Sequence, residues 1–143
     1  MRLLFITLGS VWLVACEVKP EPLAYGKDAC HSCKMTLVDK KFGAEVVTKK
    51  GKVYKFDDVN CLINFYNSDQ EPRENVKFLL VIDFDSVSHF INAKAGFYAK
   101  SPMIKSPMGS QVAAFSTKEQ FKMRNKEWNG IALSWGELIT QWK

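Results

Sequence analysis

The sequence predicts an α+β fold, in which two strand-strand-helix (ββα-type) units pack together in one small domain. In the first half, two β-type runs are separated by a Lys/Gly-rich turn and followed by an amphipathic run of helical period. The second half repeats this order more loosely. The repeat is inferred from pattern, because the two halves share no clear residue identity.

The first residues predict an export signal. After Met1-Arg2, an apolar run extends from Leu3 to Leu13, which is too short to cross a bilayer and lacks a charged flank on its far side. The run ends in Leu13-Val14-Ala15-Cys16, which resembles the processing box of bacterial lipoproteins. We therefore expect residues 1–15 to be a signal peptide and Cys16 to carry the lipid that anchors the mature chain to a membrane.

The next segment, 16–27, contains Pro20 and Pro22 and is expected to be a tether, which leaves 28–143 as a single domain. The domain should be exported and face the periplasm. Glu17, in place of the aspartate associated with inner-membrane retention, slightly favours the outer membrane. The net charge is +5, but the basic residues are dispersed without an aromatic platform, so nucleic-acid binding is not expected.

The elements of the first unit follow from short local signals. Extended chain is predicted over 36–48, with Lys49-Lys50-Gly51-Lys52 as the hairpin turn and a return strand over 53–56. Asp57-Asp58 offers a helix N-cap, and the apolar residues between 59 and 66 lie at helical spacing.

The second half begins with an almost entirely apolar run over 78–84, which predicts a central strand. The later elements, in order, are strands over 95–99 and 111–115, a helix from a Thr117 capping box to Glu127, a strand over 131–133, and a last helix capped at Ser134.

Sulfur side chains are concentrated in the stretch from Asp28 to Met35. In extended chain, Cys33 and Met35 point to the same side, so a thiolate and a thioether would converge. Soft sulfur ligands select Cu(I) over harder ions, and a thioether adds little to a zinc site. The residues equally allow a core methionine beside a small Cys30–Cys33 disulfide.

Two further positions extend this argument. Without Cys16, three cysteines remain, so at least one thiol stays unpaired in the monomer. Cys61 falls in the first turn of the predicted helix, where the helix dipole lowers a thiol pKa, but its apolar face favours a buried core residue. Met108 follows Pro107 in a loop with two Ser-Pro-Met triplets, so its thioether is either a positioned ligand or a gap filler.

These motifs together resemble the NosL family of nitrous oxide reductase accessory lipoproteins. The similarity runs in order through Asp28-x-Cys30-x-x-Cys33-x-Met35, Phe42-Gly43-Ala44-Glu45, Gly51-Lys52-x-Tyr54-Lys55-Phe56-Asp57-Asp58-x-x-Cys61, Ser106-Pro107-Met108-Gly109-Ser110 and Ala113-Ala114-Phe115. The resemblance implies a copper chaperone of denitrification that binds Cu(I) and supplies the copper centre of nitrous oxide reductase. The implied partners are the reductase and an ABC-type membrane maturation complex. The implied fold is a pair of ββα-type units, related in topology to a domain of organomercurial lyase.

Carried over residue by residue, the family's metal motif falls on Cys33 and Met35, with Met108 as a further ligand. By their own chemistry, Cys30, His31 and Cys61 are candidates for additional ligands or gating residues, and Asp28 is a candidate for orienting the ligand turn from behind. Lys34 stands where the family commonly has glycine, which disfavours a tight glycine-type turn. Asp57 and Asp58 are expected to be helix caps, since carboxylates suit harder ions.

The expected activity is metal transfer rather than catalysis. The alternative is an exported thiol-disulfide oxidoreductase that uses Cys30 and Cys33. Such pairs open a helix directly after a central strand, whereas this pair follows the predicted tether.

Overall fold

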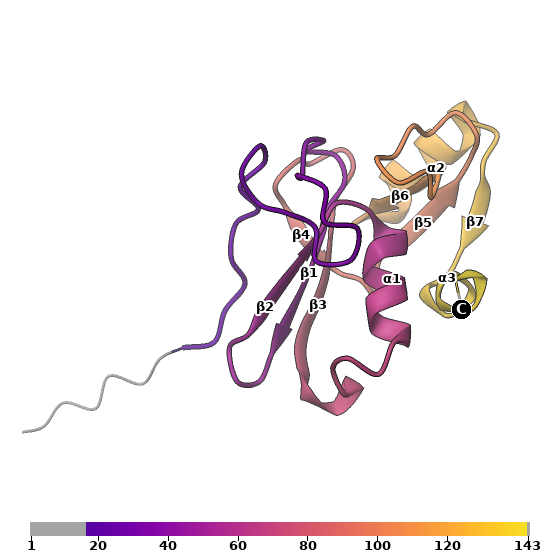
Figure 1. Cartoon of the computed structure of the whole chain (residues 1–143). Helices are drawn as coiled ribbons and strands as arrows, with labels where there is room; N and C mark the ends of the chain where they lie inside the picture. The colour runs from indigo at the N-terminus through magenta and orange to yellow at the C-terminus, as the bar shows by residue number, and fades with distance from the viewer. Residues whose placement is uncertain (1–16, 143) are drawn as a thin grey trace, which may run out of the picture.

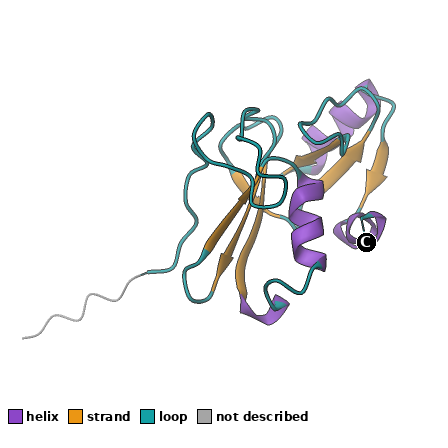
Figure 2. Ribbon diagram, viewed as in Figure 1, coloured by secondary structure: helices purple, strands orange, loops and turns teal. Residues whose placement is uncertain are grey.

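The computed structural model describes residues 17–142, which form an α+β domain with two antiparallel sheets (Figures 1 and 2). The predicted signal peptide and the lipidated Cys16 lie outside the described residues. Within 17–142, none of the helices combines the length and the apolar character that a membrane crossing requires.

The first sheet has the strand order β2-β1-β3-β4. The bounds are β1 Ala44–Thr48, β2 Val53–Phe56, β3 Val76–Ile82 and β4 Phe90–Asn92. The hairpin and the internal position of β3 confirm the predictions. β4 was not predicted, because its three residues are too few to show alternation and, unlike the equally short strand predicted over 131–133, they do not follow an Asn-Gly turn.

Helix α1 (Val59–Asn67) packs its apolar side on one face of this sheet. The helix begins at Asp58, whose side chain accepts a hydrogen bond from the backbone N–H of Val59 at 2.7 Å, as predicted for an N-cap. A short 3₁₀ turn, η1 (Arg73–Asn75), leads into β3. The main core lies between α1 and the sheet.

The second sheet has the order β6-β5-β7, with β5 Phe97–Lys100, β6 Val112–Phe115 and β7 Ile131–Leu133. Helix α2 (Lys118–Glu127) is capped by Thr117 and α3 (Trp135–Gln141) by Ser134, which forms a capping box with Glu137. The units β1-β2-α1 and β5-β6-α2 confirm the predicted architecture.

Two buried aspartates connect the units. Asp58 accepts hydrogen bonds from the backbone N–H of Met108 at 3.0 Å and from the hydroxyl of Ser110 at 2.6 Å. Asp83, just after β3, accepts one from the backbone N–H of Ser116 at 3.1 Å. The Ser-Pro-Met loop is thereby held against the N-terminal end of α1.

Candidate metal centre

Three thiols and one carboxylate meet at the N-terminal end of α1. Cys30 and Cys33 come from the loop before β1, Asp57 follows β2 directly, and Cys61 lies in the first turn of α1. One ligand atom from each lies within 4.8 Å of the others. Cys33 is partly exposed and the other three are buried, so the cluster opens to solvent at Cys33.

The loop that carries Cys30 and Cys33 is a closed turn. Ala29 and Thr36 form an isolated antiparallel bridge, and the backbone N–H of Cys30 donates to the carbonyl of Met35 at 2.7 Å. The extended geometry assumed for Cys33 and Met35 is therefore wrong. The chain reverses between them, because the bridge closes the loop on itself.

Lys34 is the residue at which the backbone reverses its direction. Its φ is +66°, in the left-handed region that favours glycine, and its backbone N–H donates to the Cys30 carbonyl at 2.9 Å. The expectation that a lysine disfavours this turn was wrong. The side-chain amine donates to the His31 carbonyl at 2.5 Å, a local bond that partly offsets the backbone cost.

Neighbouring residues fasten the turn to the domain. The backbone N–H of His31 donates to the carbonyl of Lys55 in β2 at 2.7 Å. The hydroxyl of Ser32 donates to the carbonyl of Cys61 at 2.9 Å, so the loop is tied directly to α1. The His31 ring packs edge-on against Tyr54 and lies 3.3 Å from the side-chain oxygen of Gln70. In this arrangement the imidazole is engaged beside the cluster.

Asp28 closes the base of the loop. Its carboxylate accepts from the backbone N–H of Ala24 at 2.7 Å and pairs with Lys55 at 2.9 Å. Its backbone carbonyl accepts from Leu37 at 2.9 Å. These contacts suit a residue that positions the ligand turn from behind.

The thiols differ in their readiness to lose a proton. A hydrogen bond from Cys61, with help from backbone N–H groups of Cys33 and Asp57, lowers the pKa of Cys30 to about 6. The same bond raises the pKa of Cys61, against the lowering expected from the helix dipole. Burial raises the pKa of Cys33, whose sulfur lies 3.6 Å from both Asp57 oxygens. The lowered pKa makes Cys30 the thiol of this cluster that loses its proton most readily.

The dimensions suit a single metal ion. With metal–sulfur bonds of about 2.3 Å, two ligands of one ion lie no more than about 4.6 Å apart. The cluster spans at most 4.8 Å, so small side-chain rotations bring its atoms onto one ion. Thiolates bind soft ions such as Cu(I). The three described cysteines are free rather than disulfide-bonded.

The methionine ligands stay predictions. Met35 is 55% exposed and Met108 is 36% exposed. The Met108 backbone is held over the start of α1, since its N–H donates to Asp58 and its carbonyl accepts from the Asn60 amide at 3.1 Å. The loop that carries the Met108 thioether is therefore held at Asp58, the residue next to Asp57.

Asp57 is the residue that sequence reasoning missed. It was interpreted as a cap, but Asp58 alone caps α1. No helical spacing could have shown this role, because Asp57 lies between β2 and the cap of α1, outside the helix that carries Cys61.

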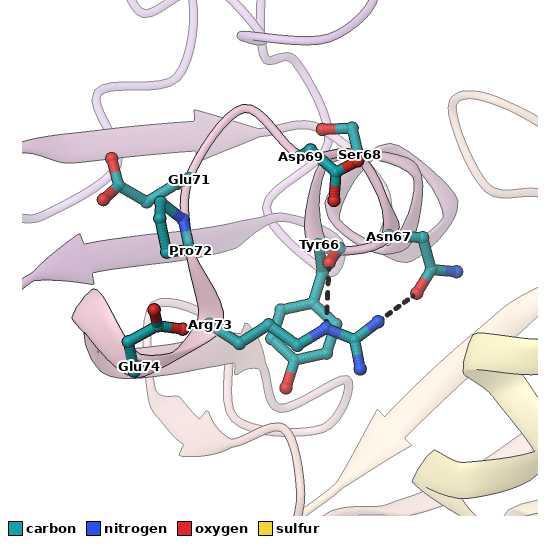
Figure 3. Close-up of a pocket in the computed structure, with 8 residues that line it drawn as sticks. All are labelled: Tyr66, Asn67, Ser68, Asp69, Glu71, Pro72, Arg73 and Glu74. Atoms are coloured by element: carbon teal, nitrogen blue, oxygen red, sulfur yellow. Dashed lines mark hydrogen bonds between the residues drawn. The ribbon is translucent and has the colours of Figure 1, made fainter.

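Two surface hollows differ in the side chains that line them. A pocket of about 400 Å³ lies between the end of α1 and η1 (Figure 3). There Arg73 stacks over Tyr66 and bonds Asn67 at 3.0 Å, but no sulfur or imidazole lines it. A hollow of about 320 Å³ beside the cluster is lined by Cys30 and His31. The larger of these two pockets therefore offers no sulfur or imidazole ligand for a soft metal ion.

Comparison with known proteins decides the family. The family model NosL matches residues 24–142, nearly all of the described chain. The chain belongs to the NosL family. The computed structure of this NosL protein matches the crystal structure of the copper chaperone NosL from Shewanella denitrificans with a TM-score of 0.70 and 23% identity. The match covers 85% of this chain and 96% of that one, and it shows a shared fold. No curated protein sequence matches the chain.

Proposed function

We propose that this NosL protein is a lipid-anchored, periplasm-facing chaperone that binds Cu(I) and delivers it for assembly of the copper centre of nitrous oxide reductase. The observation that carries the proposal is the cluster of Cys30, Cys33 and Cys61 with Asp57, whose ligand atoms lie within 4.8 Å of one another. Family membership, together with the likeness to a crystal structure named as a copper chaperone, supports copper as the cargo.

Binding begins at Cys30, the thiol whose pKa is lowered. Cys30 holds a negative charge at neutral pH, whereas Cys33 and Cys61 release their protons as the ion enters. Three thiolates and a carboxylate would bind the ion tightly, so release requires incoming ligands. The partial exposure of Cys33 and the exposed thioether of Met35 leave one side of the site open to such ligands.

Transfer then proceeds by ligand exchange. A donor sulfur or nitrogen from the partner attaches to the ion before Cys33 and the thioethers leave, so the copper is never free. The reaction changes no oxidation state and needs no catalytic residue. The reductase and an ABC-type membrane maturation complex are the partners we propose from the family.

Competition titration against a Cu(I) chelator without oxygen tests the metal site. We expect Cys33→Ser to lower the affinity about a hundredfold, and Met35→Leu and Met108→Leu each to lower it about tenfold, in line with losses on perturbing a metal shell. Met123→Leu is the matched control, because Met123 on α2 is 60% exposed and outside the centre. Wild-type affinity in Cys33→Ser would remove the assignment.

Delivery needs its own measurement. Copper-loaded protein should restore the copper-sulfur absorption of copper-free reductase, and the copper-loaded Cys33→Ser variant should not. If the protein binds Cu(I) but transfers none to the reductase, the proposed delivery is wrong, and the protein is a copper-binding lipoprotein that serves another partner.

The low pKa of Cys30 beside Cys33 is also typical of a redox thiol, which favours a thiol-disulfide oxidoreductase as the second candidate. In the structure this pair lies in a turn and does not open a helix. A disulfide-exchange assay separates the two functions. A chaperone has little activity to lose in Cys30→Ser, whereas an oxidoreductase loses all of it.

A further inference from the structure

The first described residues are fastened to the sheet. We call residues 17–22 the strap. The Lys77 amine donates to the Val18 carbonyl at 3.0 Å, and the backbone N–H of Glu21 donates to the Glu45 carboxylate at 3.0 Å. In Figure 1 the strap is the indigo segment that begins near the β1–β2 turn and runs beside β2. The strap is therefore held in one position along the sheet.

The side chains of Lys55 and Glu45 on the sheet hold the strap in place. Lys55 pairs with the Glu21 carboxylate at 3.3 Å, and Glu45 is 0% exposed. Because alternate residues of a strand point to opposite faces, Glu45 points away from Val46, which packs in the α1 core. The strap thus covers the sheet face opposite α1.

This attachment constrains the membrane anchor, and the argument rests on the lipid at Cys16 proposed above. Cys16 precedes Val18 by two residues, and an extended chain spans at most about 3.6 Å per residue. The fastened carbonyl of Val18 therefore lies within roughly 7 Å of the lipidated residue. The surface around Val18 must face the headgroups.

That surface is basic. The β1–β2 turn touches the strap, since a Cβ on Gly51 would lie 3.7 Å from a Val18 methyl group. Exposed lysines surround this contact, and we call them the basic foot: Lys19, Lys49, Lys50, Lys52 and Lys77. They outnumber the exposed acids of the same end, Glu17, Glu21 and Glu74, of which Glu21 is paired with Lys55.

We infer that the basic foot docks on anionic lipid headgroups and, together with the lipid, sets the orientation of the domain on the membrane. Lysines within a Debye length of about 10 Å are attracted to an anionic surface. The metal centre lies at the opposite end of β2. Asp57 comes five positions after Lys52, or roughly 16 Å along the strand, so the centre faces away from the lipid toward soluble partners.

Lysine footprinting on the lipidated mature chain tests the inference. The protein is reconstituted into vesicles of phosphatidylcholine with phosphatidylglycerol, into vesicles of phosphatidylcholine alone, and into detergent. Acetylation of each lysine by an amine-reactive ester is read by peptide mass spectrometry. Lys118 and Lys122, exposed on α2, serve as internal references.

On the anionic vesicles we expect Lys49, Lys50 and Lys52 to react several-fold more slowly than in detergent, with Lys118 and Lys122 unchanged. The double variant K49Q/K50Q should lose the protection of Lys52, and the matched variant K118Q/K122Q should keep it. Cu(I) affinity should be the same in both variants.

Two outcomes overturn the inference in different ways. In the first, the protein floats with the vesicles, but the lysines of the basic foot are acetylated as fast as those on α2, or are protected equally on neutral vesicles. The protein then has a lipid anchor but no docking foot. Protein that does not float at all has no lipid anchor, and both the membrane part of the proposed function and the inference fail. Neither outcome touches the metal site.

Discussion

The two β–α junctions of the domain have the same local plan but different chemistry. We compare the first, second and fifth residues after the strand. After β2 these are Asp57, Asp58 and Cys61, and after β6 they are Ser116, Thr117 and Gln120. In both, the second of these residues caps the helix. A capped helix start therefore does not by itself make a metal site.

What separates the junctions is the chain that covers them. The loop with Cys30 and Cys33 closes over the first junction, and Ser32 ties it to Cys61. The helices differ too, since α1 has six buried residues and α2 none. The candidate metal centre thus lies on the more deeply packed unit, where its side chains keep their spacing.

The largest effect should come from the two caps. Asp58→Ala removes the cap of α1 and takes the acceptor from the part-buried backbone N–H of Met108 and the buried hydroxyl of Ser110, so we expect a loss of about 4 kcal/mol in unfolding free energy. Thr117→Ala removes only a cap and should cost about 1 kcal/mol. Urea unfolding measures both. Equal losses would mean that Asp58 does not hold the units together.

The second-largest effect should come from Glu45, a buried acid in β1 of the first sheet. Burial raises the pKa of Glu45 from 4.5 to about 7. Unfolded chains ionise this group near pH 4.5, but the folded protein keeps its proton until about pH 7. The contribution to stability is therefore full below about pH 4.5, falls as the pH rises to about 7, and amounts to a loss of about 3 kcal/mol above that.

Glu45→Gln keeps an acceptor for the backbone N–H of Glu21 and removes the ionisation. We expect the variant to be up to about 3 kcal/mol more stable than the wild type at neutral to alkaline pH, with a flatter pH profile of urea unfolding. Glu119→Gln, an exposed acid on α2, is the control. An unchanged profile in Glu45→Gln would show that Glu45 is already ionised below pH 7.

The fifth position after each strand tests the metal chemistry directly. Cys61→Ser should lower Cu(I) affinity about a hundredfold, or about 2.7 kcal/mol, because a thiolate is lost from the cluster. Gln120→Ser at the matching position should change nothing. Chelator competition at fixed pH measures both. If Cys61→Ser binds as the wild type does, Cys61 is a core residue beside a smaller site.

The smallest effect concerns backbone strain, which occurs in both units. Lys34 and Gln111 have φ values of +66° and +60°. Glycine relieves that strain but gains freedom in the unfolded chain, so each substitution should stabilise the protein by about 0.5 kcal/mol. Thermal unfolding checks the gain. A change in Cu(I) affinity in Lys34→Gly alone would show that the turn is tuned for the metal.

Local signals in the sequence were sufficient for most elements of the fold. The Lys49–Lys52 turn, the caps at Asp58 and Ser134 and the apolar run of β3 each depend on neighbours a few residues away, so they could be predicted. β4 could not, because its three residues form a strand only through pairing with β3.

The sequence by itself indicated which sulfur residues are candidate ligands, because a thiol or a thioether is a soft ligand wherever it lies. Only the tertiary structure decided how they group. Cys30 and Cys61 are separated by thirty-one positions, and their contact depends on the sheet that lies between them in the chain. The same packing brought Asp57 into the cluster, turned Lys34 into the left-handed region and bound the strap to Glu45, because each of these depends on contacts between distant segments.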